Sequence, residues 1–336
     1  MNKELFGYIN GKTPVYKYEI CDSDVRVCAL DYGCTVNNFY YRDTDIVCGF
    51  DTIEDLLADN SYQGAVIGRC VNRIKDAKFT LNGIEYHLAK NNGNNHLHGG
   101  NVGFDKRIWE VVKHTENELV FHYFSPDGEE NYPANLDVQV TYKILENSLV
   151  INYKAVADND TVINLTNHAY FNADGYNAGS IYEHTAMISA DYVTEVGEDL
   201  IPTGKDLSVT GTVFDLRAPT PIGKYIGKDF EGYDNNFILK SANPVDIAGV
   251  SLPFAAQICG RKNKISVYTD QPCMQLYIGN ALEGKAPDFK GGYKRVKHVT
   301  YCLETQCAPD SPNYGKGILR KDEEYNKTTV FKIETV

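Results

Sequence analysis

Glu304 and His168 are two ionisable residues whose positions in the sequence suggest chemistry. Glu304 follows the apolar run 299–303, where a strand would bury its carboxylate, and an unpaired buried carboxylate is costly. His168 lies in the polar segment 164–172, whose alternate residues would project from one face if the segment were extended. Taken alone, such a histidine is more often a hydrogen-bonded core residue than a catalyst. Brought together, a carboxylate and an imidazole would suit general acid–base catalysis.

Four more polar residues lie beside strand-like runs and are candidates for binding a hydroxylated ligand. Asn72 and Arg73 offer planar amide and guanidinium donors, although an arginine is more often an exposed surface charge. Gln275 would share a strand face with Tyr277, which places an amide beside an aromatic ring. Asp234 lies in a turn-like segment, where capping the turn is the simpler explanation of an aspartate.

His96 and His98 would share a face of an extended segment, which leaves three interpretations open. They could bind a metal, hydrogen-bond to a polar ligand, or serve the structure alone. The metal interpretation is the weakest, because a cupin-like site needs a nearby glutamate and a third histidine, whereas the first glutamate to follow is Glu110. The glycine pair at 99–100 favours a close approach of the backbone to a ligand.

The elements that must position these residues are mostly strands. The 336 residues include 24 Tyr and 14 Phe but only 3 Met and 1 Trp, and aromatic side chains favour half-buried pleated surfaces. An Asn82-Gly83 pair between two short apolar runs predicts a hairpin, and Thr52 with Asp55 predicts the start of a short helix. Other runs bounded by turn residues predict strands at 15–20, 25–30, 119–124, 138–145, 149–157, 162–165, 265–269, 274–278 and 299–303.

Nothing in the sequence divides the chain into separate units. We find no repeat of fixed period and no Pro- or Ser-rich linker. Hydrophobic residues make up 43% of the chain, which is enough for a substantial core. We therefore expect one domain over residues 1–336, all-β in class, built as a large antiparallel β-sandwich with few short helices.

Charge and cysteine content narrow the class of partner and the compartment. The formal net charge of −12 and the absence of a basic run disfavour nucleic acid and anionic membranes as partners. The N-terminus lacks a signal-peptide pattern, and no run of 18 apolar residues predicts a membrane span. The nine cysteines are odd in number and never spaced as C-x-x-C, which argues against a disulfide framework and a cysteine-rich zinc site. We expect a cytoplasmic protein.

Six motifs, in the same order along the chain, resemble those of the aldose 1-epimerases, also called galactose mutarotases. They are Asn72-Arg73-Ile74, Leu97-His98-Gly99-Gly100, Thr166-Asn167-His168-Ala169-Tyr170-Phe171-Asn172, Gly232-Tyr233-Asp234, Gln275-Leu276-Tyr277 and Leu303-Glu304-Thr305-Gln306. The resemblance implies a β-sandwich of the galactose-mutarotase type, an open sugar cleft, and neither metal nor organic cofactor. It also implies an activity, the interconversion of the α and β anomers of a free hexose such as glucose or galactose.

Carried over position by position, the resemblance assigns Glu304 as the catalytic base and His168 as the catalytic acid. The chain departs from the family pattern at Asn235, where His is frequent, and at Ile278, where Thr is usual. Both departures concern the choice of sugar rather than the reaction. The resemblance assigns the holding of the sugar to six residues: Asn72, Arg73, His98, Tyr170, Asp234 and Gln275.

The assigned roles require Glu304 to be ionised and His168 to be protonated. A histidine with an ordinary pKa near 6.5 is only about one-quarter protonated at pH 7. We therefore expect the carboxylates of Glu304 and Asp234 to raise the pKa of His168 by charge attraction.

Three other functions would use some of the same residues. Glu304 and Asp234 would serve as the carboxylate pair of a glycoside hydrolase. A carbohydrate-binding protein without activity would have no need of a matched acid and base, and a phosphosugar epimerase would need a denser Arg and Lys cluster. As partner we expect a small monosaccharide, and the chain could act as a monomer or a homodimer.

Overall fold

Alternation of buried and exposed side chains along each long strand builds the sheets. In the computed structural model, which describes residues 2–227 and 229–336, strand β13 (Leu136–Leu145) is the clearest case. Leu136, Val138, Val140 and Tyr142 are buried, whereas the residues between them are partly or fully exposed. A strand with one apolar face must cover that face with a second layer.

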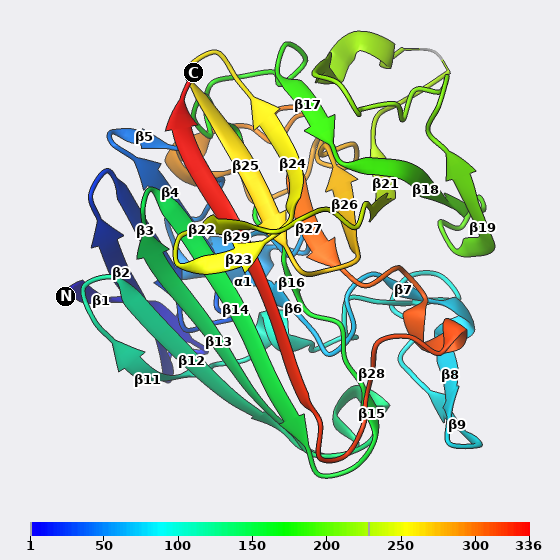
Figure 1. The fold of residues 1–336 in the computed structure, drawn as a ribbon. Helices are drawn as coiled ribbons and strands as arrows, with labels where there is room; N and C mark the ends of the chain where they lie inside the picture. The colour runs from blue at the N-terminus through cyan, green and yellow to red at the C-terminus, as the bar shows by residue number, and fades with distance from the viewer. Residues whose placement is uncertain (1, 228) are drawn as a thin grey trace.

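A nine-stranded antiparallel sheet forms the largest layer (Figure 1). The C-terminal strand runs through its middle, between strands that lie far apart in the sequence. The strands, in spatial order, are β11 (Glu110–His114), β12 (Glu118–Ser125), β13, β14 (Ser148–Ala157), β29 (Glu324–Thr335), β25 (Asn263–Thr269), β24 (Phe254–Cys259), β17 (Thr185–Ile188) and β20 (Thr220–Pro221).

A five-stranded sheet at the N-terminus packs on one end of this layer. Its strands β2 and β3 contact β12 and β13, and the shared core extends from Tyr18 to Ile333. The strands, in order, are β1 (Asn2–Ile9), β2 (Thr13–Asp22), β3 (Val25–Leu30), β4 (Val36–Tyr41) and β5 (Thr44–Asp45). The architecture is therefore the expected all-β sandwich.

A second five-stranded sheet and several two-stranded ribbons complete the fold. The sheet has the order β19 (Pro202–Ser208), β18 (Ala190–Val196), β21 (Asp234–Leu239), β26 (Cys273–Tyr277) and β27 (Cys302–Gln306). The ribbons are β6 (Val66–Ile67) with β16 (Thr166–Asn167), β7 (Arg73–Ile74) with β10 (His96–Leu97), β8 (Lys78–Leu81) with β9 (Ile84–His87), β15 (Thr161–Val162) with β28 (Ile318–Leu319), and β22 (Val245–Ile247) with β23 (Val250–Leu252).

Helices are short, as expected. The α-helix α1 (Ile53–Ala58) begins where the capping box predicts, because the Thr52 hydroxyl accepts the backbone N–H of Asp55 at 3.1 Å. The 3₁₀ segments are η1 (Lys75–Ala77), η2 (Phe104–Lys106), η3 (Glu129–Asn131), η4 (Ile222–Tyr225), η5 (Lys290–Gly292) and η6 (Ser311–Tyr314).

Local sequence signals locate some elements well and others poorly. The hairpin at Asn82-Gly83 is confirmed, with Leu81 opposite Ile84 and positive φ values at both turn residues. The predicted strand 299–303 is displaced toward the C-terminus, since the observed strand β27 begins only at Cys302. All nine cysteines are free, which agrees with the expectation of no disulfide framework.

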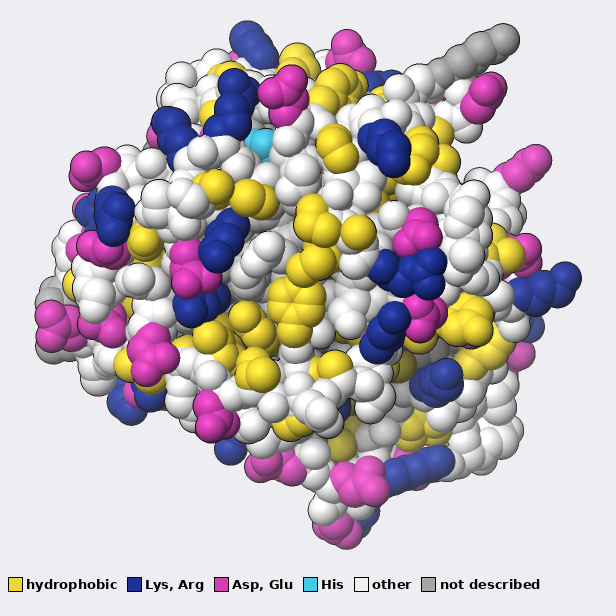
Figure 2. Space-filling view, turned by 45° about the horizontal axis from the view of Figure 1, so that its top comes forward, with side chains coloured by type: hydrophobic (Ala, Val, Ile, Leu, Met, Phe, Trp, Pro, Cys, Tyr) yellow, Lys and Arg dark blue, Asp and Glu magenta, His cyan; other side chains and the backbone are white. Residues whose placement is uncertain are grey.

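The surface carries both signs of charge. On the face shown in Figure 2, Lys and Arg side chains are interspersed with Asp and Glu rather than gathered into one patch. Among the described residues, no helix is both long and apolar enough to cross a lipid bilayer.

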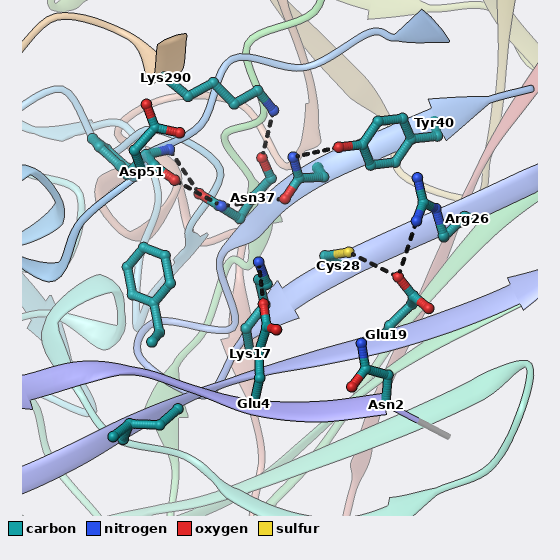
Figure 3. A pocket seen from close by; sticks show the side chains of 14 residues that line it. Asn2, Glu4, Lys17, Glu19, Arg26, Cys28, Asn37, Tyr40, Asp51 and Lys290 are labelled. Atoms are coloured by element: carbon teal, nitrogen blue, oxygen red, sulfur yellow. Dashed lines mark hydrogen bonds and ion pairs between the residues drawn. The ribbon is translucent and has the colours of Figure 1, made fainter. Parts of the chain in front are cut away.

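A hollow of about 610 Å³ lies against the N-terminal sheet (Figure 3). We call it the N-terminal hollow; its lining includes Lys17, Glu19, Arg26, Asn37 and Lys290. The polar groups of its wall bond to one another: Arg26 Nη1 pairs with Glu19 Oε2 at 3.3 Å, and Lys290 Nζ donates to the Asn37 carbonyl at 2.8 Å.

Candidate active site

Neighbouring strands of the second five-stranded sheet bring three of the predicted site residues together. Gln275 on β26 lies directly opposite Glu304 on β27, so the two side chains share a face of the sheet. Asp234 begins β21, the strand on the other side of β26. Glu304 and Gln275 are buried, at 2% and 6% exposure. One face of these strands therefore forms a buried polar floor.

His168 reaches this floor from another part of the chain. It follows β16, which pairs with β6 and contacts β27. His168 Nε2 lies 3.6 Å from Glu304 Oε2. The predicted acid and base are thus neighbours, although 135 residues of sequence separate them.

The segment around His168 is not the extended polar stripe that alternation suggested. Only Thr166–Asn167 forms a strand. The Asn164 amide donates to the Cys307 carbonyl at 3.1 Å, and the Asn172 amide donates to the Val299 carbonyl at 2.9 Å. These two asparagines therefore fasten the segment to its neighbours and do not face a common cleft.

His96 and His98 separate in the structure instead of sharing a face. His98 has a φ of +52°, which breaks the alternation of the strand that ends just before it. His96 is buried between the Ala89 carbonyl and the Tyr132 hydroxyl, at 2.8 and 2.7 Å. His96 is therefore structural, and His98 alone joins the site.

The ring of His98 is held in one tautomer. Its Nδ1 accepts the backbone N–H of Asn72 at 3.1 Å, so the neutral ring carries its proton on Nε2. The His98 ring lies edge-on to the His168 ring, with centroids 5.4 Å apart. Burial and the neighbouring His168 lower the pKa of His98 well below its usual value. His98 is thus a neutral donor beside the acid and base.

A chain of side-chain hydrogen bonds joins three of the other predicted sugar contacts, and Arg73 is held separately. The Asn72 amide donates to Gln275 Oε1 at 3.4 Å, and Gln275 Nε2 donates to Asp234 Oδ1 at 2.7 Å. Arg73 Nε donates to Asn92 Oδ1 at 3.0 Å. These groups form a row of fixed donors and acceptors, which is suited to the hydroxyls of a sugar.

The two arginines of the motif at 69–73 serve different purposes. Arg73 lies near the acidic floor, whereas Arg69 is fully buried and donates to Ser125 Oγ and the Pro133 carbonyl at 2.9 and 2.7 Å. The glycines at 99–100 also differ from expectation, because both pack against the protein itself, Gly99 on the Gly68 carbonyl.

Tyr170 lies against His168. Its ring stacks on His168 with centroids 5.1 Å apart and an angle of 21° between the planes. Its hydroxyl donates to the Ser61 carbonyl at 3.0 Å. Its contribution to the site is therefore made mainly by the ring.

Burial controls the protonation of the carboxyl groups. It raises the pKa of Glu304 well above its usual value; the charge of Asp234 adds to this rise, and Arg73 opposes it. Burial also raises the pKa of Asp234, against the Gln275 hydrogen bond and the charge of Arg73. Glu304 Oε2 is buried without a hydrogen-bond partner among the described residues, so the carboxyl is open to a ligand.

The expectation for His168 is wrong in sign. Burial lowers its pKa to about 4, and the attraction of the Asp59 carboxylate only partly offsets that effect. Desolvation outweighs charge attraction because the ring is almost completely removed from water. His168 is therefore neutral, and the raised pKa of Glu304 favours the protonated carboxyl.

His98, His168 and Glu304, which we call the acid–base cluster, also lie close enough to hold a cation, with candidate ligand atoms within 4.8 Å of one another. One observation opposes that use. The neutral His98 ring has its proton on Nε2, because its Nδ1 accepts a backbone N–H. A nitrogen that carries a proton donates a hydrogen bond and offers no lone pair to a metal. The absence of a metal stays a prediction.

The structure adds residues that the sequence did not reveal. Tyr62 stacks on His168 at 6.2 Å and lies edge-on to His98 at 4.6 Å. Behind it, Arg295 pairs with Asp59 at 2.7 Å, and both are buried. The one local signal is Gly64, whose φ of +74° marks a tight turn after Tyr62.

Known proteins resemble this chain in sequence and in structure. The family model described as Aldose 1-epimerase matches residues 16–332. The galactose mutarotase of Bos taurus is 42% identical over 99% of this chain and 98% of its own, and the aldose 1-epimerase of Haemophilus influenzae is 35% identical over 93% and 94%. The crystal structure of an aldose epimerase homologue from C. elegans superposes with a TM-score of 0.87 at 28% identity, covering 95% of this chain and 99% of that one. The chain belongs to the aldose 1-epimerase family.

Proposed function

We propose that this protein is an aldose 1-epimerase that interconverts the α and β anomers of a free hexose, with Glu304 as base and His168 as acid. One observation carries the proposal: His168 Nε2 and Glu304 Oε2 lie 3.6 Å apart, both buried, and Glu304 Oε2 has no partner among the described residues. The similarity to galactose mutarotases over nearly the whole chain supports the same reaction.

The reaction needs two proton transfers at adjacent oxygens. The base removes the proton of the C1 hydroxyl while the acid protonates the ring oxygen, and the ring opens to an aldehyde. Rotation about the C1–C2 bond presents the other face of the carbonyl, and closure with both transfers reversed gives the other anomer. Both oxygens are bonded to C1, so acid and base must lie within a few ångströms of each other. The separation of His168 and Glu304 meets that requirement.

The protonation states of His168 and Glu304 fit these roles through a single shared proton. A protonated Glu304 beside a neutral His168 holds as many protons as an ionised Glu304 beside a protonated His168. Transfer between the two groups therefore reaches the working state without exchange with solvent. The apparent pKa values of such a pair belong to the pair rather than to either residue.

The remaining predicted residues would hold the sugar. Arg73, Asp234 and Gln275 offer charged and amide groups to hydroxyls, with Asn72 at one end of the row and the Nε2–H of His98 beside the reacting centre. Such contacts exist before, during and after ring opening, so they contribute to binding rather than to the chemical step.

Polarimetry tests the proposal directly. Freshly dissolved α-glucose and α-galactose should each lose optical rotation toward equilibrium faster with the protein than without it, and Glu304→Gln should remove the acceleration. Release of reducing sugar from a disaccharide without this acceleration would favour a glycoside hydrolase instead. No acceleration with either hexose or with other aldoses would refute the epimerase.

Three further properties belong to the same proposal. We infer a single domain over residues 1–336, because the main core cluster draws on residues from Tyr18 to Ile333. We infer a cytoplasmic location, because nine free cysteines suit a reducing compartment. A small monosaccharide would be the partner, and sedimentation would decide between a monomer and a homodimer.

A further inference from the structure

The imidazole of His168 lacks the usual means of orientation. Catalytic histidines are commonly fixed by a carboxylate or a carbonyl that accepts a hydrogen bond from the second ring nitrogen. His168 Nδ1 is buried and has no hydrogen-bond partner among the described residues. Something else must set the plane of this ring.

Aromatic rings surround His168 where a hydrogen bond is missing. Tyr170 and Tyr62 lie nearly parallel to the imidazole, at angles of 21° and 26° and centroid distances of 5.1 and 6.2 Å. His98 meets the His168 ring edge-on, and Tyr62 meets His98 in the same way. Among the described residues, Tyr62 is therefore the one aromatic ring outside the predicted site that lies beside both histidines.

The turn that carries Tyr62 is bonded to the backbone of His168 itself. The N–H of Gly64 donates to the His168 carbonyl at 2.9 Å, and the N–H of His168 donates to the Ala65 carbonyl at 2.9 Å. Tyr62 has a φ of +59°, and its carbonyl accepts the N–H of Ala65 at 3.1 Å. Ring and imidazole are thus held by one short stretch of paired backbone.

A buried ion pair, a hydrogen bond and a nearby ammonium group contact the turn that carries Tyr62. Arg295 Nη1 pairs with Asp59 Oδ1 at 2.7 Å, and Arg295 Nη2 donates to Gln63 Oε1 at 3.3 Å. The Lys106 ammonium lies 5.7 Å from the centre of the Tyr62 ring, a cation–π distance. Contacts within the protein therefore support the position of Tyr62.

We propose that Tyr62 is a positioning residue: stacked with Tyr170 against His168, it holds the imidazole in the plane from which Nε2 reaches both Glu304 and the ring oxygen of the sugar. The inference rests on the proposed function for its kinetic consequences. It extends the site to a residue that makes no proton transfer of its own. Misplacement of a catalytic group by about 1 Å is enough to cost on the order of a hundredfold in rate.

The kinetic test compares three substitutions. Tyr62→Ala should lower kcat by about ten- to a hundredfold and change KM less than about threefold, because the sugar contacts remain. Tyr62→Phe keeps the ring and should retain at least about half of kcat. Tyr86→Ala, which removes a tyrosine stacked on Phe79 at 5.3 Å, is the matched control and should leave kcat unchanged. Full activity in Tyr62→Ala, or equal losses in Tyr62→Ala and Tyr62→Phe, would overturn the proposal.

A second test reads the histidine directly and needs no sugar. NMR titration of the His168 ring, assigned by its absence in His168→Asn, should show a pKa near 4 in the wild type that moves toward 6.5 in Tyr62→Ala, because water then reaches the ring. Tyr62→Phe should leave it unmoved. An unchanged His168 titration in Tyr62→Ala would show that the stack does not set its environment.

The two tests separate the two proposals. If His168→Asn keeps full activity, the proposed function fails, while the NMR titration still decides whether Tyr62 controls the imidazole. If Tyr62→Ala does not fold, Tyr62→Leu retains the apolar volume without a flat ring. Its kcat should then fall below that of Tyr62→Phe, and equality of the two would overturn the proposal.

Discussion

The N-terminal hollow and the acid–base cluster contrast in how their polar groups are satisfied. The hollow is spacious, about 610 Å³, and its charges are paired: Arg26 with Glu19, and Lys290 with Asp45 at 2.6 Å. The acid–base cluster is tightly buried, yet Glu304 Oε2 and His168 Nδ1 have no partner among the described residues. Unmet hydrogen bonds also occur at His184 and Asp105, so it is the adjacency of two such groups, His168 and Glu304, rather than volume that marks the region where chemistry is expected.

Loss of the acid or the base should be the largest effect and would sharpen this contrast. Glu304→Gln and His168→Asn should each lower kcat by about 10² to 10⁴-fold. The double variant should lose no more than the worse single one, because the two groups act as a unit. Glu19→Gln in the N-terminal hollow should keep wild-type kcat by polarimetry. Multiplying losses in the double variant would show that the two residues act separately.

Breaking the buried Lys290–Asp45 pair at the N-terminal hollow should lower stability and leave activity unchanged. In the native pair both side chains are only 6% exposed, so Lys290→Met leaves the Asp45 carboxylate buried without its charged partner. This substitution should lower the free energy of unfolding by about 3 kcal/mol. Urea denaturation measures the loss, and the activity of the folded fraction should be unchanged. The double variant Asp45→Asn with Lys290→Met should recover part of the stability. A loss below about 1 kcal/mol would mean that other donors satisfy Asp45 alone.

Burial of Glu304 in the acid–base cluster should make the free energy of unfolding depend on pH. Glu304 ionises near 4.5 when unfolded but only at a raised pKa when folded, so the folded state binds more protons between these values. The contribution of Glu304 to stability should therefore fall as pH rises through that window, opposite in sign to the contribution of His168, whose pKa is lowered to about 4. Glu304→Gln removes this term, and its stability relative to wild type should increase by up to about 1.4 kcal/mol per pH unit. A difference that stays constant from pH 5 to 8 would contradict the raised pKa.

Replacing one arginine by alanine in each region should give the smallest effects. Arg73→Ala removes a charged donor beside the buried polar floor and should raise KM about tenfold with kcat nearly unchanged. Arg26→Ala breaks the partly exposed Arg26–Glu19 pair of the N-terminal hollow. It should leave KM unchanged and alter the free energy of unfolding by no more than about 0.5 kcal/mol. A selective collapse of kcat in Arg73→Ala would place Arg73 in the chemical step instead.

Local chemistry explains what could be predicted from the sequence. The hairpin at Asn82-Gly83 and the start of α1 at Thr52 depend on residues within a few positions of each other, and both were located correctly. The family resemblance supplied the pairing of His168 with Glu304, which no local pattern contains. The separation of His96 from His98 was missed, because it depends on a positive φ that histidine adopts only in its tertiary setting.

Long-range packing explains what could not be predicted. The sign of the pKa shift at His168 depends on how completely the fold removes the ring from water, and that follows from the meeting of β16 with β27. Tyr62 carries no distinctive motif, since its contact with His168 arises only when β6 pairs with β16. Asn164 and Asn172 do not share a face with His168, as alternation in an extended segment would predict, but serve as backbone anchors, because the segment between them is mostly not a strand.

The pairing of Gln275 opposite Glu304 ties assembly of the buried polar floor to the folding of a single strand pair. If β27 slipped by one residue against β26, Glu304 would turn toward the interior and Leu303 would take its place. Such a molecule would retain its sheets and most of its hydrogen bonds but would have no base. Some of the protein recovered after refolding could therefore be compact but inert, so active-site titration would be a stricter measure of correct folding than circular dichroism.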